Sequence, residues 1–265
     1  GGRKIASSHS PRRKAPSAAA QAEVNVSEGG GVRSLHLGTP WIQGSMRIAQ
    51  PYALDLEYVQ RMMAWLLFTE PEALGRFHAM QLGLGAAALT KFCRKVLGVT
   101  TTAVEINPQV VAVCRQWFKL PPDDDRLRVI VADAQREIRQ PEWLGNVDAL
   151  MIDLYDHDAA APVLDDADFY ADCRRLLSPD ACLTVNVFGR GASSGKTLAH
   201  LRDVFGAQAL WAFKPTREGN TVLLAQRTPS RPKRALLSAR ADAIQSAWGL
   251  PAPKWLRVFK PLEPA

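Results

Sequence analysis

Strands and helices alternate along residues 79–226, and this alternation is the feature that most constrains the fold. The predicted strands are short and apolar throughout, whereas the stretches between them have helical periodicity. Strands that are apolar on both faces and separated by helices predict a mostly parallel sheet with helices on both sides. We expect strands at 79–84, 101–106, 128–133, 148–154, 181–188, 209–214 and 220–226, and helices at 87–97, 108–118, 135–139, 168–177 and 196–205.

The last two predicted strands differ from the others because no helix separates them. Residues 215–220 join them directly, which predicts an antiparallel hairpin at the edge of the sheet. A parallel sheet with this ending is typical of the α/β class I, S-adenosylmethionine-methyltransferase-like Rossmann fold.

The composition divides the chain into four parts. Residues 1–22 are basic and rich in Ser, Pro and Ala, which predicts a disordered tail. Residues 23–53 contain short β-forming pieces broken by glycines, which indicates a small N-terminal β unit. Residues 54–228 form the Rossmann-like domain, which opens with an amphipathic helix from Leu54 to Phe68. Residues 229–265 read as a basic linker and a C-terminal helix at about 236–248.

The net charge of +7 is concentrated at the two ends of the chain. Residues 1–22 hold five basic and no acidic residues, and residues 229–265 hold seven basic and two acidic residues, which leaves −3 for residues 23–228. A mildly acidic body suits a cationic small molecule, and we interpret the ends as solvated and flexible. The sequence therefore favours a small-molecule partner over nucleic acid.

Other classes of protein have little support in the sequence. The apolar runs are shorter than the roughly 20 residues of a membrane-spanning helix, and no secretion leader is recognisable, so we expect a cytoplasmic protein with no membrane contact. The four cysteines lie in separate apolar stretches, which predicts reduced, packed thiols and no zinc site.

A nucleoside site is predicted at the ends of the first three parallel strands. Gly83 and Gly85 follow the first strand, Glu105 ends the second, and Asp133 and Ala134 follow the third. Glycines let the backbone approach a ligand, a carboxylate at the position of Glu105 can accept both ribose hydroxyls, and Asp133 can accept the adenine amino group. The structural alternative is a tight glycine turn, with Glu105 capping the helix that begins at Pro108.

Three carboxylates, those of Asp153, Asp156 and Asp158, follow the fourth predicted strand. Ligands of open α/β sheets bind at the carboxyl ends of the strands, so these acids would face the nucleoside site. A carboxylate can hold an ammonium group and accept a proton from an attacking amine. Asp156 and Asp158 could instead be solvated loop acids. A divalent metal at Asp153, His157 and Asp158 is disfavoured because the spacing is irregular, and we expect no metal.

The motifs GLG, VEINP, ADA, DLYDHDAAAP, DFY and RRLLSPDACL together resemble the spermidine synthase family of polyamine aminopropyltransferases over residues 30–227. The resemblance implies decarboxylated S-adenosylmethionine as co-substrate, Asp153 as the catalytic aspartate, and Asp156 as a second carboxylate on the substrate side. It also implies that Gln43 and Tyr58 contact the nucleoside and the amine, and that the protein is a homo-oligomer, such as a dimer. Packing roles for Gln43 and Tyr58 are the alternative.

Two departures from the family pattern keep other activities open. The family has an acid in the glycine loop where this chain has Gly85, and it has Tyr-Pro-Ser-Gly-Phe-Trp in the last hairpin where this chain reads PTREGNTV. Aminopropyl transfer to a polyamine such as putrescine is the leading hypothesis. Methyl transfer from intact S-adenosylmethionine fits the missing acid, and a non-catalytic nucleoside- or polyamine-binding protein is the third possibility.

Overall fold

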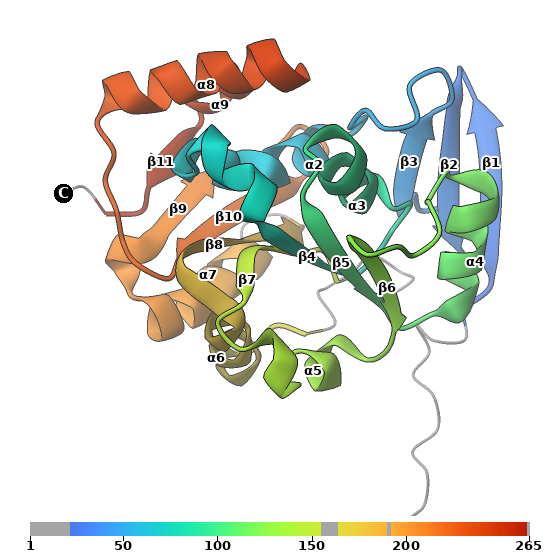
Figure 1. Ribbon diagram of the computed structural model, residues 1–265, viewed down its shortest axis with the longest axis horizontal. Helices are drawn as coiled ribbons and strands as arrows, with labels where there is room; N and C mark the ends of the chain where they lie inside the picture. The colour runs from blue at the N-terminus through green and yellow to red at the C-terminus, as the bar shows by residue number, and fades with distance from the viewer. Residues whose placement is uncertain (1–21, 155–163, 190–191, 264–265) are drawn as a thin grey trace, which may run out of the picture.

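An eight-stranded sheet forms the centre of the protein (Figure 1). The computed structural model describes residues 22–154, 164–189 and 192–263. The strands lie in the order β11-β9-β10-β8-β7-β4-β5-β6. Their bounds are β4 His78–Leu82, β5 Thr100–Glu105, β6 Leu127–Val131, β7 Val147–Ile152, β8 Leu177–Phe188, β9 Leu210–Phe213, β10 Asn220–Gln226 and β11 Phe259–Pro261. Strands β4 to β8 are mutually parallel, whereas β9, β10 and β11 pair antiparallel. The predicted fold class is thereby confirmed.

Successive residues of the central strands pack against helices on opposite faces of the sheet, because side chains alternate along a strand. Ala149 and Met151 of β7 belong to the core on one face, and Leu150 and Ile152 to the core on the other. The second face is covered by α5 (Ala134–Glu137), α6 (Ala167–Leu176) and α7 (Ala192–Phe205). The first is covered by α2 (Glu57–Arg61), α3 (Ala88–Lys91), α8 (Arg234–Trp248) and the 3₁₀ segments Met62–Phe68 and Pro71–Arg76.

A separate three-stranded antiparallel sheet forms the predicted N-terminal β unit. It comprises β1 (Val24–Gly29), β2 (Val32–Leu37) and β3 (Gly44–Arg47). Leu35 and Met46 pack against the helix α4 (Pro108–Trp117) in a third cluster of buried side chains. At Gly44 the small sheet comes so close to the turn after β4 that a Cβ atom would lie 2.5 Å from the Ala86 backbone nitrogen. This contact holds the β2–β3 loop beside the glycine turn after β4.

Two predicted helices adopt other forms in the structure. The helix expected over Leu54–Phe68 is α-helical only at Glu57–Arg61 and continues as a 3₁₀ helix, Met62–Phe68. Side chains from distant elements bond the carbonyls of this buried segment, because Thr184 donates to Met62 O and Arg240 to Leu67 O. Two of its carbonyls are thus satisfied by side chains rather than by an α-helical ladder. The helix expected at 87–97 begins as α3 and widens into a π-helix, Phe92–Val96, with bonds that reach five residues along the chain.

The C-terminal segment is not the solvated end that its composition suggested. Leu237 and Ala241 of α8, and Trp255 of α9 (Ala252–Trp255), belong to the core on the first face. Strand β11 then pairs with β9, with Phe259 opposite Phe213. The predicted hairpin of β9 and β10 therefore lies inside the edge of the sheet, because a strand from the C-terminal segment covers it.

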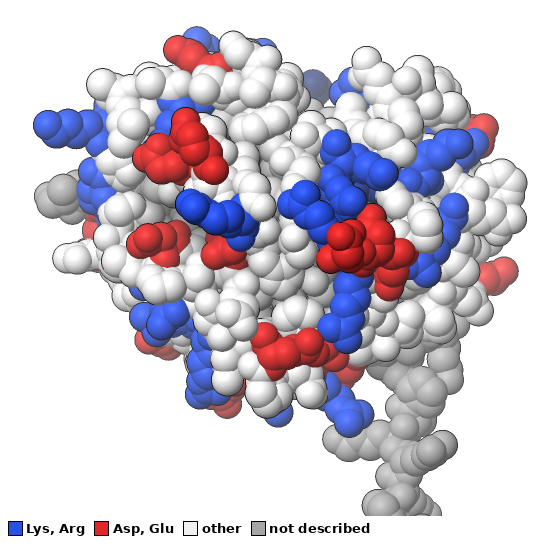
Figure 2. Space-filling model, viewed as in Figure 1, with Lys and Arg blue, Asp and Glu red and all other residues white. Residues whose placement is uncertain are grey.

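Basic and acidic side chains alternate on the face seen in Figure 2, rather than forming a continuous basic patch. Arg94 forms an ion pair with Asp124, and Arg115 forms one with Asp123. The four cysteines are buried and unpaired, as expected. Among the described helices, none combines the length and apolar character of a membrane span.

Candidate active site

A cavity of about 980 Å³ opens where the parallel strands end. Residues that follow or end β4, β5, β6 and β7 line one wall, and the β2–β3 loop, α2 and the β9–β10 hairpin complete it. The cavity thus lies outside the carboxyl ends of the strands, next to the point where the chain order reverses between β4 and β7. Open α/β sheets place their ligands at this point.

The glycine turn after β4 fits closely against the end of β7. Gly83 has a φ of +85°, and a Cβ atom there would lie 2.2 Å from the Asp153 carbonyl oxygen. Two hydrogen bonds fix this arrangement: Gly83 N–H donates to Val104 O and Asp153 N–H to Leu82 O, each at 2.9 Å. Only a glycine satisfies both the φ angle and the close approach. Gly83 and Gly85 both line the cavity.

Glu105 lines the cavity and also holds the glycine turn. Its carboxylate accepts hydrogen bonds from the backbone N–H groups of Leu84 (3.1 Å) and Asn107 (2.9 Å). Burial raises the pKa of this carboxyl above its usual value, and the backbone N–H groups oppose the rise. Helix α4 is capped by Asn107, whose side chain accepts from Gln109 N–H, so Glu105 is not the cap of that helix.

Asp133 both caps a helix and lines the cavity. Its side chain caps α5 by accepting from Gln135 N–H at 2.9 Å, and the residue lines the cavity beside Ala134. The cap uses one carboxylate oxygen, Oδ1. Asp133 is therefore placed at the same cavity as Glu105, in the order that the sequence predicts.

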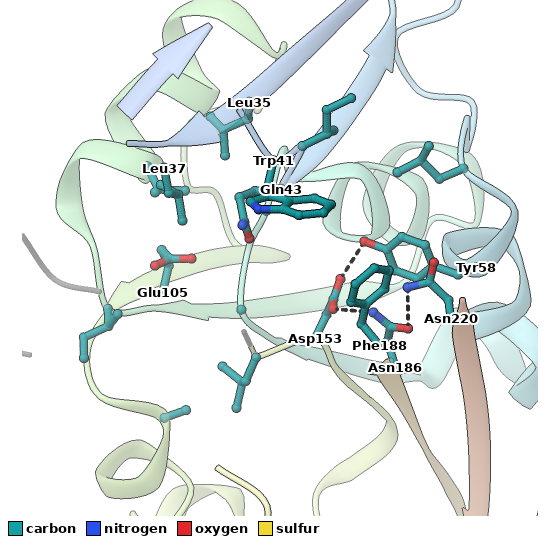
Figure 3. A pocket seen from close by; sticks show the side chains of 18 of the residues that line it. Leu35, Leu37, Trp41, Gln43, Tyr58, Glu105, Asp153, Asn186, Phe188 and Asn220 are labelled. Atoms are coloured by element: carbon teal, nitrogen blue, oxygen red, sulfur yellow. Dashed lines mark hydrogen bonds between the residues drawn. The ribbon is translucent and has the colours of Figure 1, made fainter. Parts of the chain in front are cut away.

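Asp153 lies in the middle of the cavity wall and receives hydrogen bonds from two side chains (Figure 3). Tyr58 Oη donates to Oδ2 at 3.1 Å, and Asn186 Nδ2 donates to Oδ1 at 3.0 Å. Asn220 Nδ2 in turn donates to Asn186 Oδ1 at 3.1 Å. Burial raises the pKa of Asp153, and the bonds from Asn186 and Tyr58 oppose the rise. A raised pKa makes the ionised carboxylate a better proton acceptor.

The structure brings the predicted residues Gln43 and Tyr58 to the same cavity. Tyr58 reaches Asp153 from α2, and Gln43 approaches from the β2–β3 loop, with its Nε2 buried and without a hydrogen-bond partner in the described chain. Aromatic side chains that sequence reasoning missed complete this wall. Trp41, which is 55% exposed, meets Phe188 edge-on at a centroid distance of 6.4 Å.

The described lining contains acids and no basic residue, and two of the acids pair with arginines outside the lining: Asp55 with Arg47 and Glu57 with Arg61, each at 2.9 Å. Six of the lining residues are acids: Asp55, Glu57, Glu105, Asp133, Asp153 and Glu218. The described part of the lining includes no lysine, arginine or histidine. Asn186, Asn220 and Glu218 were also missed by sequence reasoning. The signal for Asn186 was a polar amide inside an apolar strand, because a buried amide needs a partner.

Some predicted residues lie outside the described part of the chain. Asp156 is one of them, as are His157 and Asp158, so the second substrate-side acid stays a prediction. The described residues contain no cluster of three or more potential metal ligands. The homodimer and the cytoplasmic location also stay predictions.

Solved structures with the same architecture include a probable spermidine synthase from Corynebacterium glutamicum, with a TM-score of 0.68 and 18% identity over 86% of this chain and 85% of that one. A human methyltransferase-like protein 13 in complex with SAH matches with a TM-score of 0.64 and 24% identity, over 74% of this chain and 93% of that one. A spermidine synthase in complex with the transition state analogue AdoDATO matches with a TM-score of 0.53 and 14% identity, over 86% and 87%.

The fold and the position of the cavity define a class I methyltransferase-like Rossmann protein. Polyamine aminopropyltransferases of Neisseria meningitidis (serogroup A) and Chromobacterium violaceum are 34% and 32% identical to the chain, over 97% and 90% of its length and 96% and 90% of theirs. The chain belongs to the polyamine aminopropyltransferase family and is a transferase. No family model matches it.

Proposed function

We propose that the protein transfers an aminopropyl group from decarboxylated S-adenosylmethionine to a polyamine acceptor such as putrescine. The charge of the cavity carries this proposal, because six acids, two of them ion-paired with arginines, and no basic side chain are found among the described lining residues. The decarboxylated donor presents a sulfonium and an ammonium, and the acceptor presents amines. Intact S-adenosylmethionine adds a carboxylate, which such a lining repels.

The nucleoside part of the donor fits the side of the cavity formed by β5 and β6. Glu105 would accept the ribose hydroxyls, and Asp133 and Ala134 would contact the adenine. The unpartnered Gln43 Nε2 offers a further donor toward this ligand. Neighbours in complex with SAH and with AdoDATO support an adenosyl ligand for this fold.

Asp153 is placed to act on the attacking amine. The amine nitrogen would use its lone pair to form a bond to the aminopropyl carbon next to sulfur. The carbon–sulfur bond would break as that bond forms, and methylthioadenosine would leave as a neutral thioether. The new ammonium would give a proton to the Asp153 carboxylate. Orientation is the larger contribution, because sulfonium is already a good leaving group.

The acids on the far side of Asp153 favour an acceptor with two or more ammonium groups. In Figure 3, Glu105 lies on one side of Asp153, and Tyr58 and Asn220 lie on the other. Glu218 is two residues before Asn220 and lines the cavity, as does Glu57, which pairs with Arg61 at 2.9 Å. A second ammonium would be attracted to this end. We therefore expect turnover with putrescine to exceed turnover with butylamine, which has the same carbon chain and one amine.

A screen of donors and acceptors tests this function. Both sulfonium donors would be combined with putrescine, cadaverine, spermidine, agmatine and butylamine, and the nucleoside product would be identified by chromatography. The expected result is methylthioadenosine, released with the decarboxylated donor and a diamine or polyamine. Release of S-adenosylhomocysteine from the intact donor would instead establish methyl transfer. Tight nucleoside binding without turnover of any amine would establish a binding protein.

Replacing Glu105 by alanine is expected to weaken methylthioadenosine binding by about 1–3 kcal/mol, because a charged acceptor for the ribose hydroxyls is lost. Calorimetry measures the affinity, and circular dichroism checks that the fold is intact. Glu72→Ala, an exposed acid at the start of the 3₁₀ segment Pro71–Arg76, is the control and should bind normally. An unchanged affinity in Glu105→Ala would remove this residue from the nucleoside site.

A further inference from the structure

Three amide and carboxyl side chains of the cavity wall are linked by hydrogen bonds. Asn220 donates to Asn186, and Asn186 donates to Asp153, at N–O distances of 3.1 and 3.0 Å (Figure 3). Asn186 is 3% exposed and Asn220 is 7% exposed, so water competes little for these bonds. Neither residue belongs to the glycine turn or to the loop after β7.

The hairpin of β9 and β10 fixes Asn220 at the start of this series of hydrogen bonds. In the antiparallel pair of β8 and β10, Asn220 lies opposite Phe188, and Val222 lies opposite Asn186. The backbone N–H of Asn220 donates to Thr216 Oγ1 at 3.0 Å, and its carbonyl accepts from Thr216 N–H at 2.8 Å. Backbone hydrogen bonds therefore fix the position of Asn220, and its side chain donates to Asn186.

The amide of Asn186 has two ends of nearly equal shape and opposite hydrogen-bonding character. Its oxygen accepts and its nitrogen donates, so a half-turn would present the oxygen to Asp153. The donor from Asn220 satisfies the oxygen end and so selects the orientation in which the nitrogen faces Asp153. The hydrogen bond from Asn220 to the amide oxygen thus directs the amide nitrogen of Asn186, a donor, toward Asp153.

We propose that Asn220 is a positioning residue that acts through Asn186 and fixes the orientation and charge state of Asp153. Asn186 occupies Oδ1, while Oδ2 is bonded by Tyr58 and remains next to the cavity. This proposal deepens the proposed function, and its predicted effect on kcat rests on that function. The hydrogen bonds themselves can be tested without turnover.

The charge state of Asp153 depends on the groups around it. Tyr58 of α2 and Asn186 of β8 donate to it, and both bonds lower its pKa against the effect of burial. The other titratable groups that line the described cavity are Asp55, Glu57, Glu105, Asp133 and Glu218. Losing the donor of Asn186 would leave the carboxylate with Tyr58 and these acids, and its pKa would rise.

A double-mutant cycle tests the proposal. The pKa of Asp153 would be measured by carbon-13 NMR of labelled aspartate carboxyls, with Asp153→Asn used to assign the signal. We expect Asn186→Leu to raise this pKa by about one unit, because one hydrogen bond to the charged form is lost. Asn220→Leu, which adds no charge, is expected to give at least half of that shift. The double variant should show no more than Asn186→Leu alone, because the two residues act in series.

Thr221→Val is the matched control, because Thr221 is also buried on β10 and the change removes one polar group. It should leave the pKa of Asp153 unchanged. Asn220→Ser, with a shorter side chain, gives the same comparison if Asn220→Leu does not fold. A wild-type pKa in the folded Asn220 variant, or shifts that add in the double variant, would overturn the proposal.

The kinetic measurement separates this proposal from the proposed function. With an amine that turns over, Asn220→Leu should lower kcat by roughly 10-fold and leave methylthioadenosine affinity within about twofold. If kcat and methylthioadenosine affinity fell by the same factor, the role of Asn220 would be purely structural, and the proposal would be overturned. A wild-type protein that turns over no amine would contradict aminopropyl transfer, while the NMR cycle would still decide whether Asn220 acts through Asn186.

Discussion

Asp153→Asn is expected to lower turnover by on the order of 10²–10⁴-fold, because the variant loses the charge and the proton acceptor. An asparagine at this position would also meet two donors, Tyr58 Oη and Asn186 Nδ2, with only one acceptor atom. Its amide nitrogen would therefore face a donor. Nucleoside binding should change much less, because Glu105 and Asp133 lie at the ends of other strands.

The measurement is kcat with the best amine from the donor and acceptor screen, together with calorimetry of methylthioadenosine. Asp148→Asn is the matched control. Asp148 lies at the other end of the same strand, β7, and accepts hydrogen bonds from His78 N–H and the Ser178 hydroxyl. Near wild-type turnover in Asp153→Asn would refute the proposed mechanism and leave the fold assignment intact.

The pH dependence of the reaction follows from the same carboxylate. Burial raises the pKa of Asp153, and the proton acceptor must be ionised to act. The value of kcat/KM should therefore fall as the pH drops through this raised pKa, and the acid limb should be absent in Asp153→Asn. Sulfonium and ammonium ligands would favour the ionised form and move the limb of kcat to lower pH than that of kcat/KM.

The second large effect is expected from Gly83→Ala. The new Cβ atom would lie 2.2 Å from the Asp153 carbonyl oxygen, on a backbone with a φ of +85°. Neither strand end can withdraw without breaking the hydrogen bonds from Gly83 to Val104 and from Asp153 to Leu82. We expect the free energy of unfolding to fall by about 3 kcal/mol or more, and the melting temperature to fall by about 6–12 °C.

Gly98→Ala separates the two causes of this loss. Gly98 has a similar φ of +70°, and a Cβ atom there would have no neighbour within 4 Å. The free energy of unfolding of this control should therefore fall by only about 1 kcal/mol, which is the cost of placing alanine at a positive φ. Equal melting temperatures for the two variants would show that the contact between Gly83 and Asp153 does not constrain the site.

The parallel sheet could be predicted from the sequence because its strands are apolar throughout and regularly separated by helical stretches. Glu105 and Asp153 could be placed at one edge because the carboxyl ends of parallel strands meet there. Asn220 could not be placed in this way, since its role depends on the register of two antiparallel strands far apart in sequence. The 3₁₀ form of Met62–Phe68 depends likewise on Thr184 and Arg240, which are remote in the chain.

Strand β11 escaped prediction because three residues ending in Pro261 carry almost no β signal. Its place is set by ring packing, since Phe259 lies 4.5 Å from Phe213 and 5.2 Å from Trp211, measured between ring centroids. Local sequence patterns contain no information about such a pairing.

Strand β11 is near the C-terminal end of the chain, so it is synthesised after the strand that it covers. Synthesis runs from the N-terminus, so β9 leaves the ribosome before the residues that cover it. Until residues 252–261 emerge, the edge of β9 is open and the rings of Trp211 and Phe213 lack Phe259. An open, aromatic strand edge can pair with another chain. Nascent chains on one polysome would thus expose this edge to one another during this interval.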